Sequence, residues 1–176
     1  MGIIQGATEF LPISSSGHLV LFQRFTTGFE QGDLFLDIML HVGTLIAVVI
    51  YTRREVGMLI RAVLRLFGEM QTDEQRRERR LLVAVVIAGI PTAILGFFFK
   101  ATAVDYFDNL FLLAGTFAVT TVLLAWSAKL GGGKDNEVRP LPSFAIGAAQ
   151  GFAVLPGVSR SGSTIVIGQA MGLERN

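Results

Sequence analysis

The chain of 176 residues is 51% apolar and only 16% charged, and its mean hydropathy is +0.56. Soluble domains usually carry about 25% charged residues, so this composition argues against an ordinary soluble protein. The net charge of +1 gives no indication of nucleic-acid binding, and the lack of cysteine excludes disulfides and thiolate metal sites.

The first element predicted in chain order is a short apolar helix that carries polar groups and ends at Pro12. Gln5 and Glu9 have the spacing that places two side chains on one face of a helix. A glutamate within apolar sequence costs about 2–3 kcal/mol even on lenient membrane-insertion scales, so Glu9 is a candidate functional residue. A kinked membrane helix whose serines bond back to its backbone is the simpler alternative, but it leaves Glu9 unexplained. The polar residues after the proline are Ser14, Ser15, Ser16, Gly17 and His18.

Three later segments are apolar enough to cross a bilayer as helices, namely 35–51, 81–99 and 110–126. The second has no charged residue and would be about 28 Å long, close to the hydrocarbon thickness of a membrane. Helices buried in soluble proteins rarely stay apolar on all sides over such lengths, so membrane spans are favoured. Asp37 and His41 form an i,i+4 pair in the first segment. A structural hydrogen bond is the simpler interpretation of this pair, and a supporting role at a site is the alternative.

The loops between these segments predict the orientation of the protein. Eight arginines lie in 52–80, whereas 101–109 has no basic residue. By the positive-inside rule, 52–80 and the basic loop 127–142 are cytoplasmic. Residues 56–67 have an amphipathic pattern that predicts a helix at the membrane interface. Residues 131–136 are predicted to form a flexible linker between two halves.

A second polar segment, 150–162, repeats residues 5–17 without a gap. Two Pro- and Gly-broken segments in corresponding positions of a membrane protein indicate a site at a repeat interface. The matched pairs are Gln5 with Gln150, Gly6 with Gly151, Ser14 with Ser159, Ser16 with Ser161, and Gly17 with Gly162.

Arg160 lies among small hydroxyl and glycine residues, which is the composition of an anion-binding turn at the start of a helix. A planar guanidinium suits phosphate oxygens; an arginine that extends to the membrane interface is the alternative interpretation. Because a carboxylate at Glu9 would repel a bound phosphate, the pattern favours a bridging divalent cation and phosphoryl hydrolysis at the membrane. The candidate phosphate ligands are Ser14, Ser16, Gly157, Ser159, Arg160, Ser161 and Thr164.

The two segments closely resemble the motifs of the bacterial undecaprenyl pyrophosphate phosphatases of the bacitracin-resistance (BacA/UppP) family. That family shows an (E/Q)xxxE segment running into FLPxSSxGH, followed later by PGxSRSxxT. Here they are residues Gln5–His18 and Pro156–Thr164, with Gln5 at the first carboxylate position. The intervening FLDIMLHVGTLIAVV stretch also resembles the family, so the likeness extends over the whole chain.

The resemblance implies an all-α polytopic membrane protein with inverted-topology repeats and re-entrant helical hairpins that carry the motifs. It implies hydrolysis of undecaprenyl pyrophosphate to undecaprenyl phosphate, which recycles the carrier lipid for peptidoglycan synthesis and confers bacitracin resistance. It further implies a multi-pass protein of the bacterial inner membrane, a site open to the external face, and a divalent metal, Mg²⁺ or Ca²⁺.

Applied to this chain, the family motifs imply that the catalytic residues are Glu9, Ser15, His18 and Arg160. We expect Glu9, with weaker help from Gln5, to bind the metal. Ser15 is the expected nucleophile by its position in the motif, and either His18 or Glu9 would activate it. Direct attack by His18 or by metal-bound water is an open alternative.

We expect a single integral membrane domain over 1–176, with a first repeat of about 1–126, a linker of about 127–143 and a second repeat from 144. Family members continue past the second motif, so the chain is expected to be a fragment cut at both ends. A polyprenyl-phosphate transporter or flippase is the main rival. Acid-phosphatase-like lipid phosphatases need a histidine soon after Arg160, which is lacking, and a purely structural subunit leaves the ionisable residues unexplained.

Overall fold

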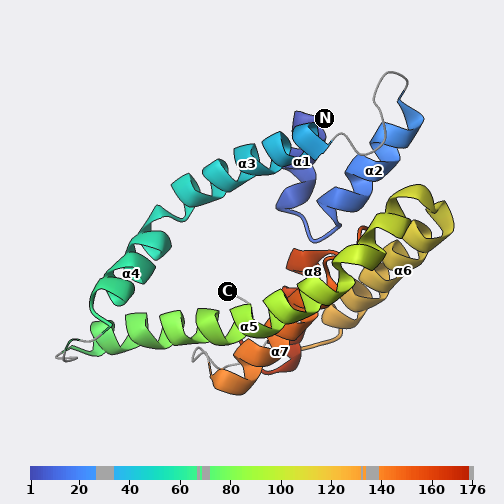
Figure 1. The fold of residues 1–176 in the computed structure, drawn as a ribbon. Helices are drawn as coiled ribbons and strands as arrows, with labels where there is room; N and C mark the ends of the chain where they lie inside the picture. Colours follow the sequence, from blue (N-terminus) through green and yellow to red (C-terminus); the bar gives the residue numbers. More distant parts are fainter. Residues whose placement is uncertain (27–33, 67, 69–71, 132, 134–138, 175–176) are drawn as a thin grey trace.

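The computed structural model describes residues 1–26, 34–66, 68, 72–131, 133 and 139–174 and is all-helical over this part of the chain (Figure 1). No strand occurs among these residues, so the predicted all-α fold class is confirmed. In chain order the helices are α1 (Gly2–Glu9), α2 (Ser15–Phe25), α3 (Leu34–Tyr51), α4 (Arg53–Leu64), α5 (Asp73–Asp108), α6 (Leu110–Ser127), α7 (Pro140–Phe152) and α8 (Arg160–Ala170).

Two helical hairpins, α1–α2 and α7–α8, contain the repeated segments, and their turns lie against each other (Figure 1). Glycines allow this close approach. A Cβ atom at Gly17 would lie 2.9 Å from the Cα of Gly157, and one at Gly162 would lie 3.2 Å from the carbonyl oxygen of Pro12. The sequence repeat pairs Pro12 with Gly157 and Gly17 with Gly162, so the two contacts are reciprocal.

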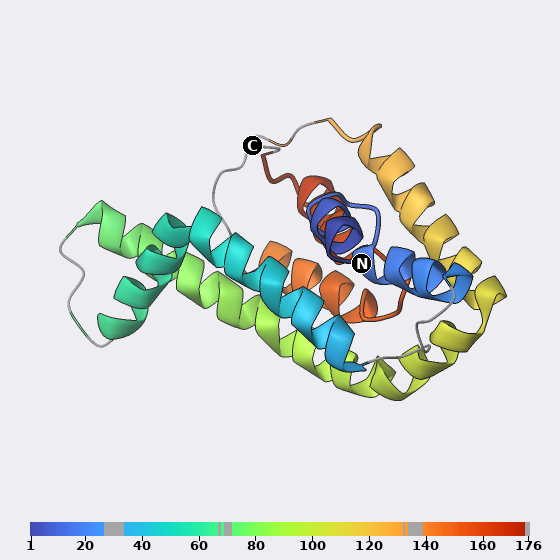
Figure 2. The same ribbon diagram turned by 90° about the horizontal axis from the view of Figure 1, so that it is seen from above.

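The second hairpin packs between the long helices α5 and α6: α7 lies along α5, and α8 lies between α7 and α6 (Figure 2). Gly147 and Gly151, four residues apart on α7, bring the α7 backbone directly against α5, with no room for a Cβ at either position. The hydroxyl of Thr92 donates to the carbonyl oxygen of Gly147 at 2.8 Å. Such small residues and interhelical hydroxyl bonds are typical of helix packing in membranes.

Two of the described helices are long and apolar enough to cross a membrane. They are the Asp73–Phe99 part of α5 and the whole of α6. In their most apolar 18-residue stretches, only 11% and 22% of the residues, respectively, are buried. A core helix of a soluble protein would be mostly buried. The predicted segments 35–51, 81–99 and 110–126 therefore all lie in helices, although the apolar part of α3, Ile38–Tyr51, is shorter.

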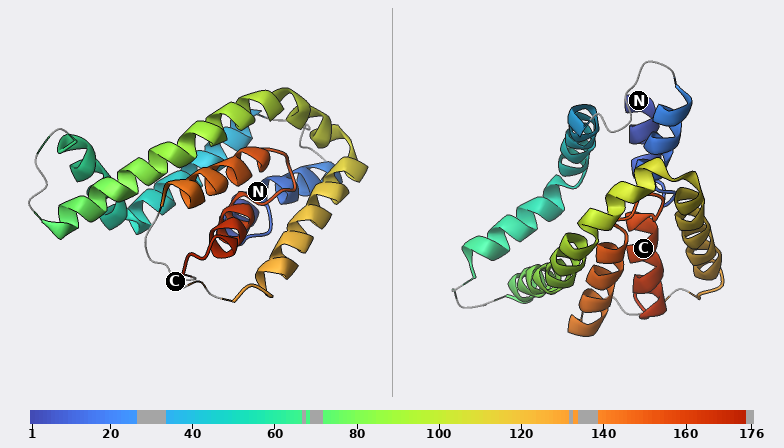
Figure 3. Two further views of the ribbon diagram at one scale, coloured as in Figure 1. Left: turned by 90° about the horizontal axis from the view of Figure 1, so that it is seen from below. Right: turned by 45° about the vertical axis from the view of Figure 1, so that its right-hand side comes forward.

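Helices α3 and α4 extend away from the hairpins and return to the beginning of α5 (Figure 3). The amphipathic segment predicted at 56–67 is α4, which begins earlier, at Arg53. Its Arg61 binds the buried carboxylate of Glu78 on α5 at 3.0 Å, and Arg65 approaches the same group at 3.9 Å. Most of the predicted flexible linker at 131–136 lies outside the described residues.

Candidate functional site

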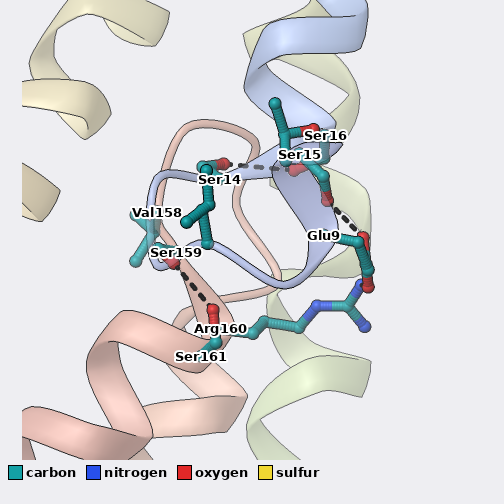
Figure 4. A pocket seen from close by; sticks show the side chains of 10 residues that line it. Glu9, Ser14, Ser15, Ser16, Val158, Ser159, Arg160 and Ser161 are labelled. Carbon is teal, nitrogen blue, oxygen red and sulfur yellow. Dashed lines mark hydrogen bonds and ion pairs between the residues drawn. The ribbon is translucent and has the colours of Figure 1, made fainter. Parts of the chain in front are cut away.

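Glu9, the last residue of α1, is the centre of a polar cluster that joins the two hairpins (Figure 4). Its Oε2 accepts hydrogen bonds from the Ser15 hydroxyl and, at 2.9 Å, from the Gln5 amide. Its Oε1 lies 3.8 Å from a guanidinium nitrogen of Arg160, on the other hairpin. The carboxylate predicted from the first motif and the arginine predicted from the second therefore face each other.

The first turn, between α1 and α2, holds Ser14 in an unusual backbone conformation. Its φ is 67°, a value that residues with a Cβ seldom adopt. Ser14 is the N-cap of α2, and its side chain accepts a bond from the N–H of Gly17 at 3.4 Å. Such strain is found at sites that the surrounding structure holds in place. The Ser14 conformation places Ser15 in the first turn of α2, where the Ser15 hydroxyl donates a hydrogen bond to Glu9.

The second turn, between α7 and α8, is fixed by two threonines of α6. The hydroxyl of Thr116 donates to the carbonyl oxygen of Pro156 at 2.6 Å, and the hydroxyl of Thr120 donates to the carbonyl oxygen of Gly157 at 2.7 Å. Thr120 also accepts the N–H of Ser159 at 3.0 Å. Gly157 has a φ of +91° and approaches Thr116 so closely that a Cβ would overlap its hydroxyl. The turn therefore requires glycine at this position.

Ser159 is the N-cap of α8 and accepts a bond from the N–H of Gly162 at 3.0 Å. Arg160 begins the helix, so its guanidinium extends from the end where the helix dipole is positive. Figure 4 shows its side chain directed toward Glu9 and away from Ser161. Together the helix end and the guanidinium favour an anion at this point.

The two turns enclose a pocket of about 50 Å³, which we call the serine pocket. Most of the predicted site residues line it, so the structure brings the two motifs together. Thr8, Leu11 and Val158 complete the lining. The predicted residues in the lining are Glu9, Ser14, Ser15, Ser16, Ser159, Arg160 and Ser161.

Four predicted site residues lie outside this lining. The imidazole Nδ1 of His18 is 2.8 Å from the carbonyl oxygen of Ser14, and its ring packs edge-on against Phe117. Thr164 donates to the carbonyl oxygen of Ser161 and lines a different cavity. Gly157 packs against Thr116 in the second turn, and Gln5 is fully buried behind Glu9.

The sequence reasoning missed Thr116 and Thr120, which lie four residues apart in the largely apolar helix α6. That spacing on a membrane span was the available signal, because such hydroxyls either bond to their own helix or reach a neighbour. The predicted Asp37–His41 pair is not tested, since the side chain of Asp37 lies outside the described residues. His41 instead lines a second cavity together with Arg160.

The residues present fit a divalent cation if the substrate supplies part of its coordination shell. Among the described residues, no three acidic, histidine or cysteine side chains lie close enough together to hold a metal ion by themselves. Glu9 provides one carboxylate, and the buried Oε1 of Gln5 has no hydrogen-bond partner. One carboxylate and one amide oxygen, together with substrate phosphates, is a donor set of the kind that Mg²⁺ accepts.

The fold and the pocket define an all-helical protein with a polar site between two matched hairpin turns. The model of the family described as "Bacitracin resistance protein BacA" matches residues 1–176. The chain therefore belongs to the BacA bacitracin-resistance family.

Curated relatives named undecaprenyl-diphosphatase are similar over nearly the whole chain. The protein of Desulfosudis oleivorans is 41% identical and covers 99% of this chain. Those of Syntrophotalea carbinolica and Halothermothrix orenii are also 41% identical and cover 95% and 100%. The chain spans 66%, 62% and 64% of the length of these three relatives.

Proposed function

We propose that the protein hydrolyses undecaprenyl pyrophosphate to undecaprenyl phosphate and inorganic phosphate. This activity would return the carrier lipid to peptidoglycan synthesis and confer resistance to bacitracin. The observation that carries the proposal is the contact across the two turns, where the Ser15 hydroxyl bonds to Glu9 and Glu9 faces Arg160. A nucleophile, its base and an anion clamp are what this reaction requires.

In the proposed reaction, the Ser15 oxygen attacks the terminal phosphorus and its proton passes to Glu9. The bond from phosphorus to the bridging oxygen breaks, and its electron pair leaves with the lipid phosphate. Water then hydrolyses the phosphoserine. Glu9 is favoured over His18 as the base because Glu9 accepts the Ser15 bond, whereas His18 lies outside the lining of the serine pocket.

The terminal phosphate is held by Arg160 and by the hydroxyls of both turns. Ser14, Ser16, Ser159 and Ser161 line the pocket in which it would lie. Gly157 and Thr164 act indirectly in this proposal, since Gly157 shapes the turn and Thr164 bonds to the Ser161 backbone. A divalent cation, Mg²⁺ or Ca²⁺, held by Glu9 and Gln5, would neutralise phosphate charge.

We further propose that the two hairpins are re-entrant elements of inverted repeats in a multi-pass protein of the bacterial inner membrane. The first repeat would cover about 1–126 and the second would begin at 144. The reciprocal glycine contacts at the turns support this arrangement, because a two-fold axis between the hairpins would produce such pairs. By the charge of the loops, the site would open to the external face.

The test is phosphate release from undecaprenyl pyrophosphate by the longest natural form of the protein in detergent. We expect release that a chelator abolishes and Mg²⁺ or Ca²⁺ restores. Arg160→Lys should lower kcat/KM about tenfold to a hundredfold, because the bidentate fork is lost. Arg54→Lys, on exposed α4, is the matched control. A transporter would release no phosphate without a sealed membrane, and that result would overturn the proposal.

A further inference from the structure

A second cavity adjoins the serine pocket and shares Ser16 and Arg160 with it. Its volume is about 310 Å³, against about 50 Å³ for the serine pocket. We call it the chamber, since it lies among α3, α5 and α7. Its remaining lining residues are His41, Thr92, Gly96, Gln150, Gly151, Ala153 and Val154.

The chamber offers hydrogen-bond donors but, among its described lining residues, no carboxylate. An imidazole at His41, an amide at Gln150 and the guanidinium of Arg160 line it together. The serine pocket, in contrast, contains the carboxylate of Glu9. The chamber is therefore the more favourable of the two cavities for a second negative charge.

Arg160 has the capacity to serve both cavities. Its side chain is 55% exposed, and its distance of 3.8 Å to Glu9 is that of an ion pair without a hydrogen bond. A guanidinium has five N–H donors, so most of them are available to ligands on either side. A pyrophosphate could therefore place one phosphate in each cavity, with Arg160 in contact with both.

Small residues keep the chamber open and make part of its wall apolar. A Cβ at Gly96 would meet no atom within 4 Å, which shows that space lies beside α5 there. Ala153 and Val154 add apolar surface next to the polar groups. A ligand that suits this lining carries a phosphate on an apolar chain.

We propose that the chamber binds the lipid-bonded phosphate of the substrate and the start of its isoprenyl chain. The terminal phosphate then lies in the serine pocket. This inference rests on the proposed function and assigns Gln150 and His41 to the leaving isoprenyl monophosphate. The matched glutamines thus differ in use: Gln5 is fully buried and bonds to Glu9, whereas Gln150 is exposed in the chamber.

The test measures equilibrium binding of farnesyl monophosphate by calorimetry in detergent, which does not depend on turnover. Gln150→Glu, nearly isosteric, should raise its Kd about tenfold or more, because a carboxylate would then face the phosphate. Gln150→Leu should raise it less. Gln75→Glu, at the capping box of α5, makes the same chemical change far from the chamber and should leave the Kd unchanged.

Two comparisons make the result decisive. Ser161→Asp adds a charge to the serine pocket and should affect farnesyl monophosphate less than Gln150→Glu does. Farnesol, which has no phosphate, should bind both Gln150 forms equally. If Ser161→Asp has the larger effect, or Gln150→Glu has none, the assignment of the chamber is overturned. Failure of the proposed function would appear separately, as the absence of phosphate release by the unmodified protein.

Discussion

The two turns that form the serine pocket have the same framework and different chemistry. In each, a serine caps the second helix and contacts a second serine, at 3.4 Å for Ser14 with Ser16 and at 3.3 Å for Ser159 with Ser161. Two of the positions that differ bring different chemistry to the two sides of the pocket: Ser15 corresponds to Arg160 in the repeat, and Glu9 corresponds to Val154. The matched caps therefore give the two turns a similar frame, in which one side carries Glu9 and Ser15 and the other carries Arg160.

The turns also differ in how they are held. The second is bonded by buried hydroxyls of α6, a helix that lies outside both hairpins. The first contains the strained backbone at Ser14 and packs against the second through Gly17. The side that carries Arg160 is thus fixed by hydrogen bonds from a neighbouring helix, whereas the side that carries Ser15 is held by its own cap and by packing at Gly17.

The largest expected effect comes from the carboxylate that only the first turn carries. Glu9→Gln keeps the size of the side chain but removes the carboxylate that we propose as the base for the Ser15 proton. We expect kcat for phosphate release to fall by about 10²–10⁴, the usual contribution of general-base catalysis. Glu74→Gln, in the exposed first turn of α5, is the matched control.

The same variant discriminates between the two candidate bases. If Glu9→Gln retained near-normal turnover while His18→Gln lost it, the base would be His18 and the Ser15–Glu9 bond would be structural. The pH profile of the surviving activity would then follow an imidazole rather than a carboxyl group.

A smaller effect is expected from Thr120, which holds the second turn by hydrogen bonds. Thr120→Val removes the hydroxyl that bonds to both Gly157 and Ser159, and leaves these buried backbone groups unsatisfied. We expect a loss of about 1–3 kcal/mol in the free energy of unfolding, with a raised KM because Arg160 follows this turn. Thr121→Val, at the adjacent exposed position, is the control.

Thr120→Ser keeps the hydroxyl, so its free energy of unfolding and its KM should both lie close to those of the unmodified protein. A structural role alone would lower stability in Thr120→Val and leave the KM of the folded protein unchanged. That outcome would contradict the view that α6 positions the arginine.

The sequence predicted the elements of the site better than their contacts. Pro12 and the run of serines located the first turn, and uninterrupted apolar sequence located α5 and α6, because these features act through local backbone preference and hydropathy. The partner of His18 could not be predicted, since its choice between Glu9 and the Ser14 carbonyl depends on the orientation of α2 in the fold. The pairing of Arg61 with Glu78 was likewise missed, because these residues are 17 apart in the sequence and meet only through the packing of α4 on α5.

The smallest expected effect compares the two caps directly. Ser14 has a φ of 67° and Ser159 has a φ of −75°, although the repeat matches them. At a helix N-cap, alanine is less favourable than glycine in general. Only at residue 14 does alanine also add the cost of a left-handed backbone, about 1 kcal/mol. The difference in unfolding free energy between the Ala and Gly variants should therefore be larger at Ser14 than at Ser159 by about this amount. Equal differences, measured by denaturant unfolding in detergent, would mean that the first turn is not strained and that the two caps are equivalent in energy as well as in sequence.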